Sequence, residues 1–226
     1  MNMKGLYELM SWMSPSYPVG AYTYSHGIEF AVEDGLIKTV HDLIPWISDI
    51  VAFGSGRMDT IILAEAYHAG ATQDDERLLQ VAEIAHACRA TKELDLETTA
   101  QGRAFMKITH DVFPSRTVSV LQNKWEGPIV YPVVVAAAAA DRDIGLEETL
   151  TAYLHGFVSN LVSAAVRIVP LGQTDGQKTI AALEDVTSRQ VQAALSSTLD
   201  DLGSATLMVD WCSCQHETQY TRLFRS

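Results

Sequence analysis

One amphipathic pattern constrains the fold more than any other feature of this chain. Over residues 146–169, apolar side chains recur at i, i+3 and i+4 for roughly five helical turns. They are Leu146, Leu150, Tyr153, Leu154, Phe157, Val158, Leu161, Val162, Ala165, Val166 and Val169. Pro170 and Gly172 follow at once and end the pattern. An apolar stripe of this length must be covered by other elements, so it predicts a long helix inside a helical bundle.

Helical spacing also dominates the rest of the chain, and no stretch shows strong alternation bounded by hairpin turns. The 226 residues are 47% apolar and 19% charged, which suits one domain with a sizeable core. We therefore predict an all-α, single-domain bundle of about eight to ten helices over residues 1–226. The predicted helices are 4–13, 24–33, 41–54, 58–68, 74–91, 94–112, 132–140, 146–169, 174–195 and a last stretch from 200.

The charge balance limits the classes of partner. The chain has 16 basic and 28 acidic residues, a net charge of −12, which is the wrong sign for binding nucleic acid or an anionic membrane. The longest apolar run, residues 129–140, is too short to cross a bilayer as a helix. No secretory signal is visible, and three cysteines make no disulfide framework, so we expect a cytoplasmic protein.

Two Glu-x-x-His pairs, Glu65/His68 and Glu83/His86, raise the question of a metalloenzyme. Such pairs on facing helices build di-iron sites in bundles. The phase of the apolar face around Glu83 turns that side chain outward, so solvated polar faces are the favoured interpretation and a helical metal-binding enzyme is the alternative. No nucleophile–base set can be assembled from the sequence, and the segment 172–179 fails the spacing of a phosphate-binding loop.

A second metal candidate is the segment "CSCQH", which offers Cys212, Cys214 and His216. Thiolates and imidazole suit zinc, copper or nickel. In a helix only Cys212 and His216 share a face, because they are four residues apart. We regard the three as weak metal candidates, and ordinary apolar packing of the cysteines as the alternative.

The opening segment "SPSYPVGAYTYSHGIEFAVEDG", residues 14–35, carries a distinctive motif. It resembles the N-terminal signature of the UreF family of urease accessory proteins at Pro18, Val19, Gly20, Tyr22, Tyr24, Ser25, Gly27 and Glu29. Three further blocks resemble the family in the same order: "QGRAF" at 101–105, residues 162–177, and "HETQYTRLFRS" at 216–226. The chain departs from the family where "VVVAAAAA" has Ala instead of a usual Gly, and Cys212 and Cys214 are not part of the pattern.

The resemblance implies an all-helical protein without catalytic activity or a cofactor of its own. Members of the family form homodimers. They join the D-type accessory protein, called H in some organisms, and the GTPase UreG in a complex that delivers nickel to apo-urease. A GTPase-regulating role and transit of nickel are further implications.

The residues of the motif suit a docking surface better than an active site, because nothing near them supplies a nucleophile–base pair. Tyrosines give a broad contact area at a low entropic cost. The resemblance places Glu29 and Arg167 on a surface that faces the GTPase. We therefore predict that the GTPase face comprises Tyr22, Tyr24, Glu29, Arg167 and Gln173.

The last residues form a basic, aromatic terminus on an acidic protein. Tyr220, Leu223 and Phe224 recur at i, i+3 and i+4, which is the spacing of a helix face that enters a groove. Arg222 and Arg225 flank them and could bind carboxylates. We predict a docking tail around 216–226 that binds the D-type protein and adds little to the stability of the core.

Overall fold

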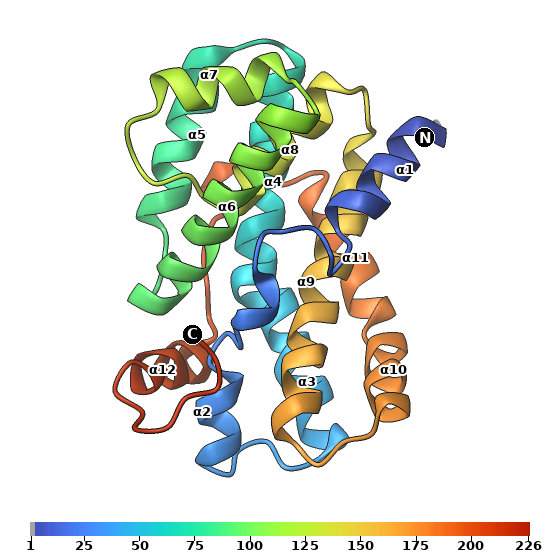
Figure 1. Cartoon of the computed structure of the whole chain (residues 1–226), viewed down its shortest axis with the longest axis vertical. Helices are drawn as coiled ribbons and strands as arrows, with labels where there is room; N and C mark the ends of the chain where they lie inside the picture. The colour runs from blue at the N-terminus through green and yellow to red at the C-terminus, as the bar shows by residue number, and fades with distance from the viewer. Residues whose placement is uncertain (1–2) are drawn as a thin grey trace.

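The computed structural model describes residues 3–226, which contain twelve α-helices, two short 3-10 helices and no strand (Figure 1). The all-α prediction is confirmed. The helices are α1 (Met3–Trp12), η1 (Ala21–Thr23), α2 (Ile28–Glu33), α3 (Val40–Phe53), α4 (Ser55–Ala71), α5 (Asp75–Ala87), α6 (Lys92–Val112), α7 (Arg116–Lys124), α8 (Tyr131–Asp141), α9 (Leu146–Ile168), α10 (Gln173–Ala182), α11 (Glu184–Ala194), η2 (Leu199–Asp201) and α12 (Leu207–His216).

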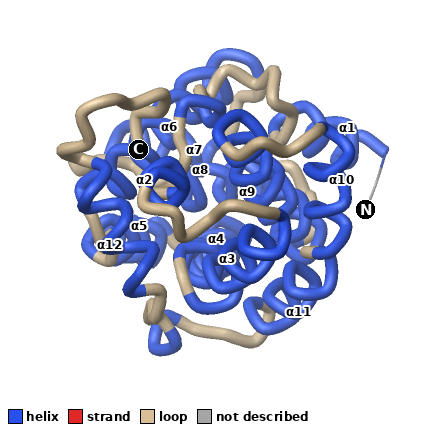
Figure 2. The backbone as a smooth tube through the Cα atoms, turned by 90° about the horizontal axis from the view of Figure 1, so that it is seen from below, coloured by secondary structure: helices blue, strands red, loops and turns tan. Residues whose placement is uncertain are grey.

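The centre of the core is α8, whose residues 132–140 are all buried. Its sequence of valines and alanines has no polar face, as expected for a helix enclosed on every side. Figure 2 shows α8 surrounded by its neighbours, and its most extensive packing is against α4 and α6. Small side chains allow this close packing: a Cβ added at Gly70 of α4 would lie 3.1 Å from the Cβ of Ala140.

The "QGRAF" block places Gly102 where α6 crosses the segment that leads into α8. A Cβ at Gly102 would lie 2.2 Å from the carbonyl oxygen of Ile129, a distance that no side chain can tolerate. Glycine is therefore required here for the close approach of two backbones. Three residues later, Phe105 is fully buried and packs against Trp12 with ring centroids 5.6 Å apart.

The long helix predicted at 146–169 is confirmed as α9, within one residue at its end. The structure has more helices than the ten predicted ranges for two main reasons. The range 174–195 divides at the buried Leu183 into α10 and α11. The sequence analysis also missed α7, which Ser115 caps by accepting a hydrogen bond from the N–H of Val118.

The region before α2 differs from the predicted helix at 24–33, because α2 begins only at Ile28. Gly20, His26 and Gly27 all have positive φ, a backbone conformation that interrupts a helix. At Gly27 an added Cβ would lie 3.0 Å from the backbone nitrogen of Ser213, so the turn packs directly on α12.

Within residues 3–226, no helix has the length and apolar character needed to cross a membrane.

Candidate partner-binding surface

The C-terminal segment, residues 217–226, lies on the body of the protein and is not helical. In Figure 1 the chain leaves α12, loops outward and ends beside α2. The backbone of its last two residues is bound to the loop before α2. The N–H of Arg225 donates to the carbonyl of Thr23 at 2.8 Å, and the carbonyl of Ser226 accepts hydrogen bonds from both the N–H and the hydroxyl of Ser25, each at 2.6 Å.

Glu29 is the main anchor of this segment. Its side chain is buried, and its two carboxylate oxygens accept hydrogen bonds from the N–H groups of Leu223 at 2.6 Å and Phe224 at 2.9 Å. The Nε2 atom of His216 lies 3.0 Å from one of the same oxygens. Hydrogen bonds from backbone N–H groups to a carboxylate are stronger than those between neutral groups. Glu29 therefore fixes the path of the terminal segment.

His216 joins Glu29 to a second carboxylate. Its ring is completely buried, and Nδ1 lies 2.8 Å from Glu93 of α6. A neutral imidazole carries only one N–H, so two carboxylate partners require one further proton, on the ring or on a carboxylate. Burial raises the pKa of Glu93, while His216 and Arg222 act in the opposite direction. Arg222, 3.2 Å from Glu93, adds a positive charge at the solvent side.

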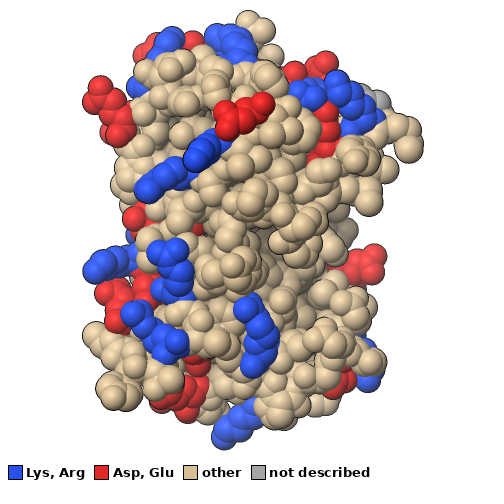
Figure 3. Space-filling view, in the orientation of Figure 1, with Lys and Arg blue, Asp and Glu red and all other residues tan. Residues whose placement is uncertain are grey.

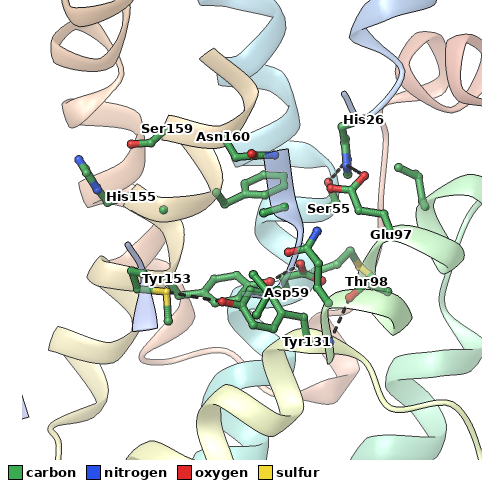
Figure 4. A pocket seen from close by; sticks show the side chains of 18 of the residues that line it. His26, Ser55, Asp59, Glu97, Thr98, Tyr131, Tyr153, His155, Ser159 and Asn160 are labelled. Carbon is green, nitrogen blue, oxygen red and sulfur yellow. Dashed lines mark hydrogen bonds and ion pairs between the residues drawn. The ribbon is translucent and has the colours of Figure 1, made fainter. Parts of the chain in front are cut away.

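A parallel set of contacts joins the terminal segment to α4 and α6. The hydroxyl of Ser226 donates to Glu97 at 3.1 Å, and His26 Nδ1 lies 3.2 Å from the same carboxylate. His26 Nε2 lies 2.6 Å from the hydroxyl of Ser55, and Figure 4 shows His26 directed at both partners. Serine, histidine and carboxylate stand here in the order of a hydrolytic triad, so the expectation that nothing near the motif supplies a nucleophile–base pair is wrong. Because Glu97 is shared with the terminal segment, we assign the set to holding that segment in place.

Two exposed arginines, Arg167 beside the terminal segment and Arg225 within it, contact aromatic rings here. The guanidinium of Arg167, at the end of α9, donates to the carbonyl of Tyr22 at 2.6 Å and lies 4.4 Å from the ring centroid of the buried Phe224. The guanidinium of Arg225 lies 5.9 Å from the ring centroid of Tyr24. Residues predicted for the GTPase face and for the docking tail are thus in direct contact.

A cavity of about 330 Å³ lies beside these contacts, between the N-terminal loop and α4, α6 and α9 (Figure 4). Its deep part contains Asp59, which accepts a hydrogen bond from the hydroxyl of Tyr153 at 2.7 Å and pairs with Arg89 at 2.8 Å. Burial, reinforced by the charge of Asp59, raises the pKa of Tyr153 well above its usual value. This phenol therefore stays protonated and acts as a structural donor.

The prediction of a helix face in the tail is wrong. Tyr220 is fully exposed and Leu223 is 63% exposed, whereas Phe224 is only 4% exposed, so the three do not share a face. The N–H groups of Leu223 and Phe224 bond to Glu29 rather than to carbonyls one turn earlier, which excludes a helix. The stability of the core without this segment stays untested, but the burial of Phe224 and the hydrogen bonds to Glu29 lead us to expect that the fold depends on it in part.

The residues predicted for the GTPase face differ in accessibility. Tyr22 and Arg167 are exposed, but Tyr24 and Glu29 are buried and can act only by holding the residues around them. Gln173 is exposed at the first residue of α10, which Figure 1 shows on the far side of α9 from α2. Tyr22 and Arg167 are therefore the members of the set that a partner could contact beside the terminal segment.

The predicted metal ligands are not brought together. Cys212 and His216 are buried in α12 while Cys214 is exposed, and both nitrogens of His216 face glutamates. Burial raises the pKa of Cys212 to about 12, so its thiol stays protonated. Across residues 3–226, no group of three or more His, Cys, Asp and Glu side chains could hold a metal ion.

The two Glu-x-x-His pairs are also separate structures. Glu65 is buried, contrary to the expectation of a solvated polar face, and it pairs with Arg77 of the next helix at 2.5 Å. His68, the other member of this pair, is exposed. Glu83 is exposed, and His86 lies 3.2 Å from Asp95.

Comparison with known proteins identifies the family. The UreF family model matches residues 37–184, which is more than half of the chain. The chain belongs to the UreF family. A protein of Rhodopseudomonas palustris strain BisA53, named urease accessory protein UreF, is 48% identical over 98% of this chain and 93% of its own length. Proteins of the same name from Bradyrhizobium diazoefficiens and Granulibacter bethesdensis are 46% and 45% identical over 98% of this chain, and over 91% and 94% of their own lengths.

These similarities cover 98% of the chain, so they extend beyond residues 37–184 on both sides and include the opening motif. The relatives are named as accessory proteins of urease and not as enzymes, in agreement with the expectation of a non-catalytic protein. Sequence reasoning missed Glu93, Glu97 and Ser55, which complete the contacts around His216 and His26. Each is one polar residue in a helix, and nothing local distinguishes it from a solvated side chain.

Proposed function

We propose that this chain is a non-catalytic scaffold for urease maturation, which joins the D-type (H-type) accessory protein and recruits the GTPase UreG so that nickel is inserted into apo-urease. Membership of the UreF family supports a role in urease maturation. The partners and the transfer of nickel belong to the proposal. So do the homodimer and the cytoplasmic location.

The observation that carries the proposal is the direct contact between residues of the two predicted partner sites. Arg167, predicted for the GTPase face, stacks on Phe224 of the tail, and Glu29 holds the backbone of the tail. A partner that displaces the terminal segment would therefore alter the support of Arg167 and Tyr22. This arrangement suits a scaffold whose two binding events depend on each other.

The buried and exposed residues take different roles in this proposal. Tyr22 and Arg167 contact the GTPase, while Tyr24 and Glu29 position the loop and the terminal segment behind them. Tyr220 and Leu223 are the exposed apolar residues of the tail and the best candidates for contact with the D-type protein, since Phe224 is buried. Nickel is cargo in this scheme. The alternative of a Glu-x-x-His metalloenzyme has no support, because the two pairs do not form one site.

The test is assembly from purified proteins. The chain, the D-type protein and UreG of the same organism are mixed and separated by size-exclusion chromatography. We expect one peak with all three, and we expect Arg167→Ala to lose the GTPase while retaining the D-type protein. Arg189→Ala is the matched control, because Arg189 is an exposed arginine on α11. If the wild-type chain binds neither partner, the proposed function is wrong. If Arg167→Ala still assembles with both partners, the predicted GTPase face is wrong.

A further inference from the structure

The cavity between the N-terminal loop and α4, α6 and α9 contains a glutamine that none of the contacts described above uses. Gln101 is the first residue of the "QGRAF" block on α6, and only 7% of it is exposed. It lines the cavity, and its side-chain amide has no hydrogen-bond partner within residues 3–226. A buried amide that bonds to nothing opposes folding, so this one calls for a partner from outside the chain.

Other polar groups along the same cavity also lack partners in the part of the chain that the structure describes. The indole N–H of Trp12 and one guanidinium nitrogen of Arg89 are buried without an acceptor, and both residues line the cavity. Asn160 of α9, which Figure 4 shows among the side chains around the cavity, has an amide without a hydrogen bond. The cavity therefore offers two donors and two amides, and each amide can both donate and accept.

Most charged groups along the cavity are already paired within the chain. Asp59 binds Arg89 and the hydroxyl of Tyr153, and Glu97 binds His26. An ionic ligand would leave water without finding a free counter-charge among these groups, which is costly. The outer surface agrees with this, because Figure 3 shows few charged side chains where the N-terminal loop crosses between α6 and α9. These observations favour an uncharged ligand.

Aromatic side chains make up much of the wall. Tyr131 and Tyr153 lie with ring centroids 5.5 Å apart, and Trp12, Tyr17 and Phe157 also line the cavity. Aromatic walls of this kind pack well against a flat ring. The volume of about 330 Å³ is at the lower end of the range for small-molecule sites, so the ligand should be small.

We infer that this cavity binds a small, uncharged aromatic molecule that carries a carboxamide. The oxygen of the carboxamide accepts from the amide of Gln101 or from Arg89, and its N–H groups donate to the amide oxygens of Gln101 or Asn160. The aromatic ring packs among the tyrosines. This site uses none of the residues proposed for contact with a partner protein, so it does not depend on the proposed function.

The test compares three probes that share one ring and differ in charge: benzamide, benzoate and benzylamine. Each is titrated into the purified full chain, and binding is measured by calorimetry and by saturation-transfer NMR. We expect benzamide to bind with a Kd of about 1 mM or lower, and both ions to bind at least about tenfold more weakly. Benzylamine is a stringent comparison, because Asp210 lines the cavity, is half-buried and makes no ion pair with a described residue.

Substitutions locate the site. Gln101→Leu keeps the approximate size of the side chain and removes its amide, so the affinity for benzamide should fall about tenfold or more. Its Tm should be unchanged or higher, because the lost amide makes no hydrogen bond within the described chain. Gln122→Leu is the matched control, since Gln122 is exposed on α7, and it should bind as the wild type does. If Gln101→Leu is unfolded, Asn160→Leu decides.

Three results would overturn the inference. One is that the wild type binds none of the three probes. Another is that benzoate or benzylamine binds more tightly than benzamide, which would indicate an ionic site. The third is that Gln101→Leu and Asn160→Leu both bind benzamide as the wild type does. A lower Tm of Gln101→Leu with unchanged benzamide affinity would assign that residue a purely structural role and would count against the site.

Discussion

Replacing Glu29 by alanine should destabilise the fold, although the sequence motif suggests a surface residue. The buried carboxylate accepts hydrogen bonds from Leu223 and Phe224 and contacts His216, so its loss leaves three polar groups unsatisfied. Each unsatisfied buried group costs about 1–3 kcal/mol, and breaking a buried ion pair costs about 3–5 kcal/mol. Because these costs overlap, we expect a decrease of about 3–5 kcal/mol in the free energy of unfolding.

For a chain of this size, 1 kcal/mol corresponds to about 2–4 °C in Tm, so Glu29→Ala should melt roughly 6–20 °C below the wild type. Circular dichroism at 222 nm follows the transition. Glu33→Ala is the matched control, because Glu33 lies one turn later on α2, is exposed, and has one described side-chain hydrogen bond, to the half-buried Gln219. A surface change of this kind should stay within about 0.5 kcal/mol. Equal melting of the two variants would refute the assignment of Glu29 as the anchor of the terminal segment.

Other substitutions test the packing and the charges. Gly102→Ala should lower Tm by several degrees despite alanine's better helix propensity, because its Cβ would collide with the carbonyl of Ile129; a higher Tm would contradict this. Phe224→Ala should cost about 3–5 kcal/mol, while Tyr220→Ala in the same segment should leave Tm unchanged, and equal effects would refute the described path of the tail. The raised pKa of Glu93 makes its protonated form more stable in the folded state than in the unfolded state. The stability of the wild type relative to Glu93→Gln should therefore decrease as pH rises from the usual glutamate pKa through the raised one, measured as the difference in Tm from pH 4 upward; a difference independent of pH would exclude this role.

The long helices could be predicted from the sequence because their stability depends on one continuous apolar face. α9 followed from its spacing, and α8 followed from a run of valines and alanines that suits only complete burial. The start of α2 could not be predicted, since the positive φ of His26 depends on packing against α12 and α6. α7 was missed because it has only nine residues and is mostly polar, with Val118 and Leu121 as its buried apolar residues.

The motif identified Glu29 as important but gave no indication of its role. Its partners His216 and Phe224 lie 187 and 195 residues later in the chain, and no local pattern connects residues so far apart. The prediction of a helix in the tail was wrong because a local pattern was present but did not decide the structure. Spacing of i, i+3 and i+4 over five residues fits a helix, but it cannot exclude an irregular segment held by side chains of the body.

The proposal that this chain enables nickel insertion into urease is tested by the nickel content of urease itself. Urease would be purified from cells that express its operon with the gene for this chain deleted, restored, or replaced by Arg167→Ala. We expect restored cells to yield urease with nickel close to saturation, and deleted cells and Arg167→Ala cells to yield urease with little nickel at equal protein levels. Arg189→Ala should behave as the wild type does. Equal nickel content in urease from deleted and restored cells would contradict this proposal.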